Sequence, residues 1–346
     1  MRIITSDNRN ASGALTPNDA NPVAFGLLKE IPDIAALSTE WDLLLEQSPC
    51  NRAFSSSTWF LATCDSITGI SPRVFTARRG PNLVGILPLV LRAGGQEMGF
   101  PHNMSDYQDL IAAPDDPHVL TDLLRHAADS ARGNRSLVLT RVRRDSNLAR
   151  ASEGLDGSYG HKLSFDTQHA YIYLPPCYEQ YLMTRSQKFR KGIKRAQRLA
   201  EALDVSVREL EPDAVPSEHL ADLFLALHLS RFGDKSCFQR GPERSFIVAA
   251  LPKLFKERKV RVFALLERER TIGIDLYAVG ANSLCAWNGG FLPEAERWSP
   301  GRLFLGAAIR LAYEMRLAEV DLLQASHKWK HQWTNQLRDV VRIEIA

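Results

Sequence analysis

The sequence predicts an α/β protein of the α+β type, built from two related halves that each form a mixed, mainly antiparallel sheet flanked by helices. The chain has 346 residues, about twice the usual size of a domain, so two domains are expected. Residues 73–75 (RVF) recur as 261–263, and residues 85–86 (GI) recur as 273–274 at the same offset. In both places a strand, a short polar turn and a second strand are predicted, and a helical pattern follows, which indicates a duplication.

The first half contains the predicted elements in a simple order. Residues 1–22 are polar, without a continuous apolar stretch, and are expected to be a flexible tail and not a signal peptide. The elements after the tail are helices at 33–47 and 55–67, a hairpin with its turn at 78–82, a helix around 120–127 and a strand at 136–142.

The second half repeats this order and adds further strands. Its predicted elements are a strand at 205–210, helices at 217–230 and 242–257, strands at 260–266, 271–279 and 284–291, a helix at 301–316, a strand at 320–323, a short helix and a strand at 340–345. We expect a linker at 152–164 and a shared strand near 171–174. The two domains are therefore predicted to span 23–164 and 165–346.

Composition excludes several classes of protein. The net charge of +3 is too small for a nucleic-acid binder that uses its whole surface, so any basic site must be local. The five cysteines are odd in number and widely spaced, which favours reduced thiols and a cytoplasmic protein. The longest apolar stretch, residues 83–91, is about half the roughly 20 residues that a membrane span needs, so no membrane insertion is expected. The chain also lacks the sequence motifs of P-loop proteins, dinucleotide-binding enzymes and serine hydrolases.

A strongly basic helix is predicted at the start of the second half. Seven basic residues and no acidic residue lie between Arg185 and Arg198, while apolar residues repeat at helical spacing from Phe189 onwards. A phosphorylated substrate, a coenzyme tail or tRNA could dock on such a face, with Arg190 and Lys194 as the candidate contacts. A solvated charged face remains the alternative.

Two segments of the second half have the chemistry of a site. Ser299-Pro300-Gly301-Arg302 lies where a strand leads into a helix, and the free N–H groups of a helix start attract phosphate, although an ordinary capped helix would have the same sequence. The segment from Asp321 to Trp333 carries titratable and aromatic groups just beyond a sheet edge, among them Trp329 and Lys330. His327 and His331 are four residues apart, but no third ligand has suitable spacing, so no metal site is expected.

Three further side chains are candidates for catalysis or substrate binding. Asp275 and Tyr277 alternate on one strand and therefore share a face, and an acid on a central strand must be paired or functional. His228 lies near the end of a predicted helix, where it could be a general base for an attacking amine, although a His at such a position more often simply interacts with the helix end.

The element order of the second half resembles the GNAT acyltransferase fold. The tandem arrangement is similar to a branch that includes the Fem-type aminoacyl transferases and acetyltransferases linked to polysaccharide synthesis. The motifs that carry the resemblance are Ser186–Arg198, Trp298-Ser299-Pro300-Gly301 and Asp321–Trp333. The fold class expected from it is two tandem GNAT-like domains, of which the first is degenerate.

The resemblance also implies roles for particular residues. Ser299, Gly301 and Arg302 would hold the pyrophosphate of acetyl-CoA or another acyl-CoA, although one glycine stands here where two are common. Lys330 matches a lysine that follows an aromatic residue and stabilises negative charge on the reacting carbonyl. Asp106 and Tyr107 resemble a recurrent patch of the first domain that lines the acceptor cleft.

Three functions remain open at this point. The first is an acyl-CoA-dependent N-acyltransferase acting on an amine or hydroxyl of a small-molecule or sugar-linked acceptor, such as a cell-envelope precursor. The second keeps the fold but takes its acyl group from aminoacyl-tRNA, with the basic helix as part of the tRNA contact. The third is a non-catalytic module that binds an anionic partner.

Overall fold

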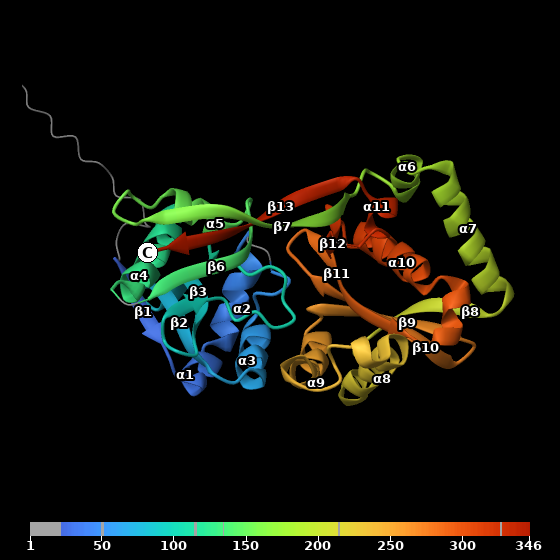
Figure 1. Ribbon diagram of the computed structural model, residues 1–346, viewed down its shortest axis with the longest axis horizontal. Helices are drawn as coiled ribbons and strands as arrows, with labels where there is room; N and C mark the ends of the chain where they lie inside the picture. Colours follow the sequence, from blue (N-terminus) through green and yellow to red (C-terminus); the bar gives the residue numbers. More distant parts are fainter. Residues whose placement is uncertain (1–21, 50–51, 114–115, 134, 214, 326) are drawn as a thin grey trace, which may run out of the picture.

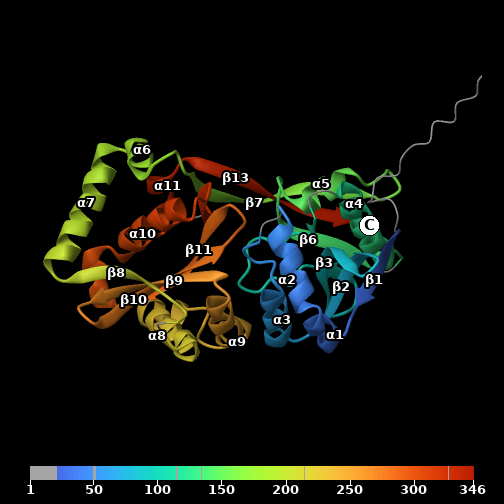
Figure 2. The ribbon, with the colours of Figure 1, turned by 180° about the vertical axis from the view of Figure 1, so that it is seen from behind.

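The computed structural model describes residues 22–49, 52–113, 116–133, 135–213, 215–325 and 327–346. The predicted tail, apart from its last residue, and Cys50 lie outside these ranges. Two halves lie side by side along the long axis of the molecule, and β7 and β13 run from one half into the other (Figure 1; Figure 2 shows the opposite side). The described strands form a single sheet in the order β1-β2-β3-β4-β6-β13-β7-β12-β11-β10-β9-β8, with β5 paired to β3.

In the first half, the sheet lies between two groups of helices. Because side chains alternate along a strand, Phe75 of β2 packs in the cluster under α4, whereas its neighbour Val74 packs in the cluster under α1–α3. The elements are β1 (Val23–Leu28), α1 (Ile31–Ala36), α2 (Ser38–Gln47), α3 (Ser57–Ser66), β2 (Ile70–Arg79), β3 (Asn82–Arg92), β4 (Glu97–Gly99), β5 (Ile111–Ala112), α4 (Pro117–Ala131), β6 (Ser136–Arg143) and α5 (Asn147–Glu153).

The second half has the same layers. Phe263 of β9 faces the cluster formed with α7 and α10, while Val262 faces the cluster formed with α8 and α9. The elements are α6 (Tyr178–Met183), α7 (Gln187–Ala202), β8 (Val205–Leu210), α8 (Leu220–Phe232), α9 (Pro242–Lys256), β9 (Val260–Glu267), β10 (Arg270–Val279), β11 (Ser283–Phe291), α10 (Pro300–Glu314), β12 (Glu319–Gln324) and α11 (Lys330–Trp333). The predicted class, a mainly antiparallel sheet flanked by helices, is confirmed.

Two long strands join the halves. β7 (His161–Tyr173) pairs with β12 of the second half, and β13 (Gln336–Ile345) pairs on one side with β7 and on the other with β6 of the first half. Within the predicted linker at 152–164, residues 154–160 connect the end of α5 to the start of β7 at His161, and the rest of the stretch belongs to these two elements. The last strand of the chain completes the sheet of the first half, so the backbone hydrogen bonds of that half depend on the second.

Aromatic side chains fill the space between the halves. The Trp59 ring of α3 lies 5.2 Å from Phe246 of α9 and 4.8 Å from Trp287 of β11, measured between centroids. All three belong to one buried cluster that takes residues from both halves. The halves therefore share a core as well as a sheet.

Two neighbouring strands separate in the middle of the second half. β11 and β12 are parallel, and they pair only at Ser283–Cys285 with Glu319–Asp321, although β11 continues to Phe291. Beyond the pairing, β12 bulges against β7, and Leu323 has a φ of 59°, in the left-handed region. The separation opens the sheet toward the start of α10. Within the described residues, no helix has the length and hydrophobicity that crossing a membrane requires.

Candidate active site

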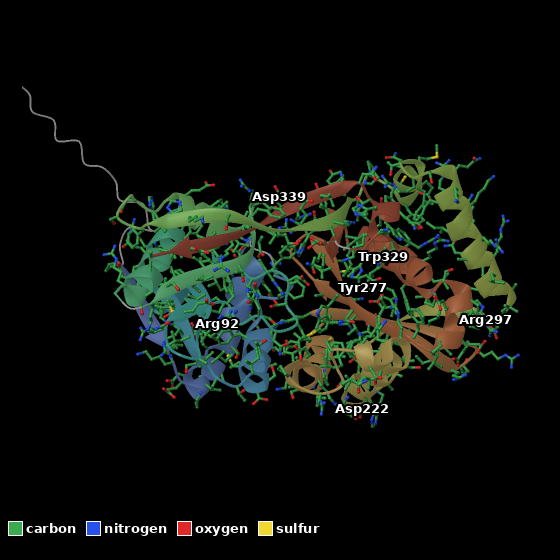
Figure 3. The ribbon with its side chains drawn as sticks, in the orientation of Figure 1. Arg92, Asp222, Tyr277, Arg297, Trp329 and Asp339 are labelled. Carbon is green, nitrogen blue, oxygen red and sulfur yellow. The ribbon has the colours of Figure 1, made fainter. Side chains whose placement is uncertain are left out.

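A pocket of about 790 Å³ lies where β11 and β12 separate. Its lining includes residues of α8, β10, β11, β12, α10 and α11, and Tyr277 and Trp329 lie close together in the middle of the second half (Figure 3). The structure brings seven of the predicted site residues to this one pocket. They are Asp275, Tyr277, Ser299, Gly301, Arg302, Trp329 and Lys330.

Asp275 is the titratable acid of the β10 wall. Its carboxylate accepts a hydrogen bond of 2.6 Å from the Tyr277 hydroxyl, two residues along the same face of the strand. Burial raises the pKa of the Asp275 carboxyl to about 7, while the Tyr277 hydrogen bond and the positive charge of Arg231 oppose the rise. At neutral pH this group can therefore take up or release a proton inside the pocket.

Gly289, directly across the sheet from Asp275 on β11, makes room for that carboxyl. A Cβ at this position would lie 2.1 Å from Asp275 Oδ1 and 2.9 Å from the Ile274 carbonyl oxygen. Sequence reasoning missed Gly289. A glycine pair inside a predicted strand was the available signal, because it indicates close approach of another group.

The start of α10 faces the same pocket. Ser299 has a φ of 57°, so the chain turns sharply in a left-handed conformation before the helix begins at Pro300. Pro300 has no N–H, and the N–H of Gly301 has no hydrogen-bond acceptor among the described residues. Apart from its chain neighbours and the backbone of its own helix, no atom of the described residues lies within 4 Å of a Cβ built on Gly301, so the helix start is open to a ligand.

Arg302 extends from this helix start toward α7. Its Nη1 lies 2.9 Å from a Cβ built on Gly192, so a side chain at 192 would displace the guanidinium. Its Nη2 donates a long hydrogen bond of 3.5 Å to Gln332 Oε1. Arg302 and Gln332 also line a second cavity, of about 450 Å³, next to the first.

Lys330 is buried at the opposite wall. Its ammonium group donates hydrogen bonds of 2.5 Å to the Leu322 carbonyl and 2.6 Å to the Gln324 carbonyl, in the bulged part of β12. Burial lowers the pKa of Lys330 to about 8, and the negative charges of Asp106 and Asp321 oppose that fall. Two of its three N–H donors are thus used by the backbone, and the positive charge stays beside the pocket.

Other predicted site residues lie elsewhere. His228 does not line the pocket: it is buried among the Phe224, Phe232 and Phe238 rings, and its Nδ1 is 2.9 Å from Ser236 Oγ. Burial and the positive charge of Arg231 together lower the pKa of His228 to about 4, while a side-chain hydrogen bond with Asn288 opposes the fall. Asn288 itself lines the pocket, so His228 lies one residue behind the pocket wall.

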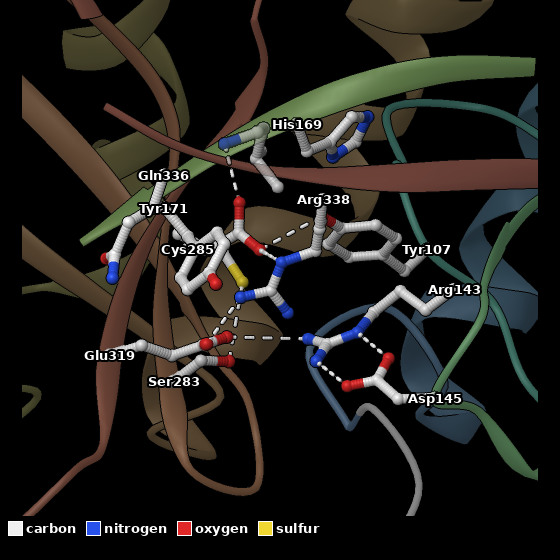
Figure 4. A network of polar contacts seen from close by, with 12 residues as sticks. Tyr107, Arg143, Asp145, His169, Tyr171, Ser283, Cys285, Glu319, Gln336 and Arg338 are labelled. Carbon is white, nitrogen blue, oxygen red and sulfur yellow. Dashed lines mark hydrogen bonds and ion pairs between the residues drawn. The ribbon is translucent and has the colours of Figure 1, made fainter. Parts of the chain in front are cut away.

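Asp106 and Tyr107 lie at the junction between the halves, outside the pocket lining. The Tyr107 hydroxyl donates a 2.9 Å hydrogen bond to Asp321 Oδ2, and its ring packs 4.7 Å from that of His169. Figure 4 shows this network, which continues through Arg338 to Glu319. Burial raises the pKa of Asp106, and Arg141 opposes the rise. The contacts of Tyr107 join the two halves.

The basic helix is present, but its two named candidates lie away from the lining. α7 buries Phe189, Ile193, Ala196 and Ala200, as the spacing predicted. Arg190 contacts the Met183 carbonyl, and Lys194 is exposed; neither lines the two cavities. Arg185 and Lys188, earlier on the same run, do line the second cavity.

Several pocket residues were not singled out from the sequence. Arg231 lies with its guanidinium carbon 4.1 Å from the Phe291 ring centroid, and Asn288 and Glu296 complete the polar part of the lining. These residues come from three separate elements, so no local spacing pattern could connect them. In the described part of the chain, no group of three or more His, Cys, Asp or Glu residues is arranged to hold a metal ion.

Comparisons with known proteins agree with this geometry. Residues 187–331, which include all the lining residues of the pocket except Gln332 and Trp333, match the acetyltransferase (GNAT) domain family. No curated protein matches the chain.

Solved structures resemble the chain over nearly its whole length. FemX is similar with a TM-score of 0.63 at 11% identity, covering 89% of this chain and 95% of that one. L-PGS from Bacillus licheniformis has a TM-score of 0.57 at 11% identity, covering 88% and 90%. A conserved protein of unknown function from Bacteroides thetaiotaomicron has a TM-score of 0.56 at 11% identity, covering 94% and 99%. At these identities the likeness establishes only the fold that the chain shares with these proteins.

Proposed function

We propose that this protein is an acyl-CoA-dependent N-acyltransferase, most simply an acetyltransferase, whose active site is the pocket between β11 and β12. The observation that carries the proposal is the set of groups that line that pocket. An acid with a pKa of about 7, an open helix start and a buried ammonium group lie around one space of about 790 Å³. The match of residues 187–331 to the acetyltransferase (GNAT) domain supports the same reaction class.

The residues present fit a coenzyme at this site. Ser299, Gly301 and Arg302 would hold its diphosphate, with the free N–H of Gly301 and the guanidinium of Arg302 as donors. When bound, an acyl-CoA supplies a thioester whose acyl group an amine can take, with coenzyme A thiol released. The separation of β11 from β12 gives the thioester end a path toward Asp275.

Asp275 then acts as the general base. As the acceptor amine forms its bond to the acyl carbon and the carbon–sulfur bond breaks, the Asp275 carboxylate takes the proton that the nitrogen loses. Tyr277 donates to the same carboxylate and fixes its orientation. Lys330 contributes positive charge near the reacting carbonyl oxygen, where negative charge develops. Trp329, which is 44% exposed at the pocket rim, offers a flat surface for the acceptor.

An assay of thiol release tests this proposal. The full chain is incubated with acetyl-CoA and a panel of amines, including amino sugars, and free coenzyme A thiol is followed. We expect acceptor-dependent release that falls by about 10²–10⁴-fold in Asp275→Asn. Asp234→Asn, at an exposed position outside the pocket, is the matched control and should keep the wild-type rate. Equal rates in both variants would remove Asp275 from the reaction.

The exposed face of α7 favours aminoacyl-tRNA as a second candidate donor. Five basic side chains, Lys188, Lys191, Lys194, Arg195 and Arg198, are exposed along this helix. If tRNA docks there, its affinity should fall by orders of magnitude between about 50 and 200 mM salt, since each phosphate contact releases counterions. Filter binding of aminoacylated tRNA measures this, and an affinity too weak to detect at low salt would exclude the candidate.

A further inference from the structure

The second cavity gathers positive charge beside the proposed coenzyme site. Its volume is about 450 Å³, and its lining contains arginine, lysine and histidine side chains and no acidic side chain. The lining residues are Thr184, Arg185, Ser186, Lys188, Phe189, Arg302, His331, Gln332 and Asn335. The cavity lies between the start of α7, the start of α10 and the short helix α11.

Within the part of the chain that the structure describes, these cations have no carboxylate partners. Among the described residues, no Asp or Glu oxygen lies within 4.0 Å of the charged nitrogens of Arg185, Lys188 or Arg302. The polar contacts that Arg185 and Arg302 make are with neutral groups, Thr184 Oγ1 at 3.1 Å and Gln332 Oε1 at 3.5 Å. A cavity lined by one sign of charge concentrates the opposite charge in its ligand.

The two cavities are neighbours that share two lining residues. Arg302 and Gln332 line both, and Gly192 lets the Arg302 guanidinium lie directly against α7. A ligand that passes Arg302 from the start of α10 therefore reaches Arg185 and Lys188 next. The guanidinium and ammonium groups there suit a terminal phosphate, which carries up to two negative charges.

We propose that the second cavity recognises the 3′-phosphate on the nucleotide end of the acyl donor, with Arg185 and Lys188 as its contacts and Arg302 shared with the diphosphate. This rests on the proposed function, because it assumes that an acyl-CoA occupies the first pocket. It goes further by assigning donor recognition to α7. The protein would accordingly distinguish coenzyme A thioesters from otherwise identical donors that lack the 3′-phosphate.

Calorimetric titration of the full chain with acetyl-CoA and with 3′-dephospho-acetyl-CoA tests the proposal. We expect the dephospho compound to bind at least about 10-fold more weakly to the wild type, as expected when a charge-assisted contact is lost. In the double variant Arg185→Gln, Lys188→Gln, acetyl-CoA should bind as weakly as the dephospho compound, whose own affinity should not change. The double variant Lys253→Gln, Lys256→Gln removes the same charge from exposed positions outside both cavities and should retain the wild-type preference.

The outcomes separate this inference from the function on which it rests. Equal binding of both compounds to the wild type would overturn the assignment of the second cavity while leaving an acyl-CoA donor in place. A preference that persists unchanged in Arg185→Gln, Lys188→Gln would also overturn it, because other residues would then recognise the phosphate. Binding of neither compound would contradict the proposed function itself.

Discussion

At the scale of single residues, the site depends on one carboxyl group with a shifted pKa. The Asp275 carboxyl is held in the β10 wall by a Tyr277 hydrogen bond, and burial raises its pKa to about 7 from its usual value near 4. The folded protein then binds this proton more tightly than the unfolded chain does. The stability that the raised pKa of Asp275 contributes is fully present below about pH 4 and is lost as the pH rises toward about 7.

Replacing Asp275 by Asn should therefore change stability and activity in opposite directions. At pH 8 the variant should melt at a higher temperature than the wild type, because it removes a desolvated charge, and the difference should vanish near pH 4. Wild-type turnover should rise as the pH increases through about 7, since the base must be ionised. Thermal unfolding and rate measurements across pH 4–9 check this, and a lower melting temperature of the variant at pH 8 would contradict it.

A second prediction concerns the space that Gly289 leaves. In Gly289→Ala, the new methyl group would meet Asp275 Oδ1 at 2.1 Å, so the carboxyl must move. Displacement by about 1 Å can cost about 10²-fold in rate, and we expect a loss of that order. Gly157→Ala is the control, because no atom lies within 4 Å of a Cβ there and it is outside both cavities. Wild-type turnover in Gly289→Ala would show that the exact position of Asp275 is unimportant.

At the scale of elements, the pocket exists because β12 leaves its partner strand. The bulge that ends regular pairing of β12 exposes the Leu322 and Gln324 carbonyls, and the Lys330 ammonium satisfies both. Lys330 thus has a structural role beside the electrostatic one proposed for it. Its short helix, α11, is held at the pocket edge by this contact.

Lys330→Met should lower the free energy of unfolding by about 2 kcal/mol or more, because two buried carbonyls lose their donor. Chemical denaturation measures this loss. Lys328→Met, at an exposed neighbouring position, should leave stability within about 0.5 kcal/mol of the wild type. If both variants were equally stable, the ammonium group would have no structural role, and any loss of turnover in Lys330→Met would then be purely catalytic.

The elements were more predictable than the site. Periodicity located the hairpins and most helices, since burial on one face of each imposes a spacing on the sequence. The same reasoning correctly gave the buried face of α7 from Phe189 onward, but it could not tell which of the basic residues point into a cavity. By residue type alone, His228 and Asp275 were equal candidates for a catalytic role. Only the arrangement in space separates them, because it buries His228 against phenylalanine rings and leaves Asp275 facing the pocket.

At the scale of the whole molecule, we expect the two halves to unfold as one unit. β13 supplies backbone hydrogen bonds to β6 of the first half, and the Tyr107–Asp321 hydrogen bond and the Trp59–Trp287 contact join the halves elsewhere. The sequence indicated the duplication, but it could not show that the last strand crosses into the first half. Such pairing links residues about 200 positions apart, as in Val341 with Val142, and leaves no local pattern.

A chain shortened after Asn335 should therefore lose the cooperative unfolding of both halves. Removing β13 leaves β6 and β7 with unpaired hydrogen-bonding groups in the middle of a sheet. Circular dichroism during heating and hydrogen exchange of the first half check this. A sharp, wild-type-like transition of residues 22–160 expressed alone would show instead that the first half folds independently.

The central claim is that an acyl-CoA binds in the pocket where β11 and β12 separate, with its diphosphate at the start of α10. Calorimetric titration of the wild type and of Gly301→Trp with acetyl-CoA tests it most directly, because position 301 has open space for a side chain that would then occupy the pocket. We predict binding to the wild type that Gly301→Trp abolishes while the melting temperature is unchanged. Equal binding to both proteins would place the coenzyme elsewhere, and absence of binding to the wild type would contradict an acyl-CoA donor.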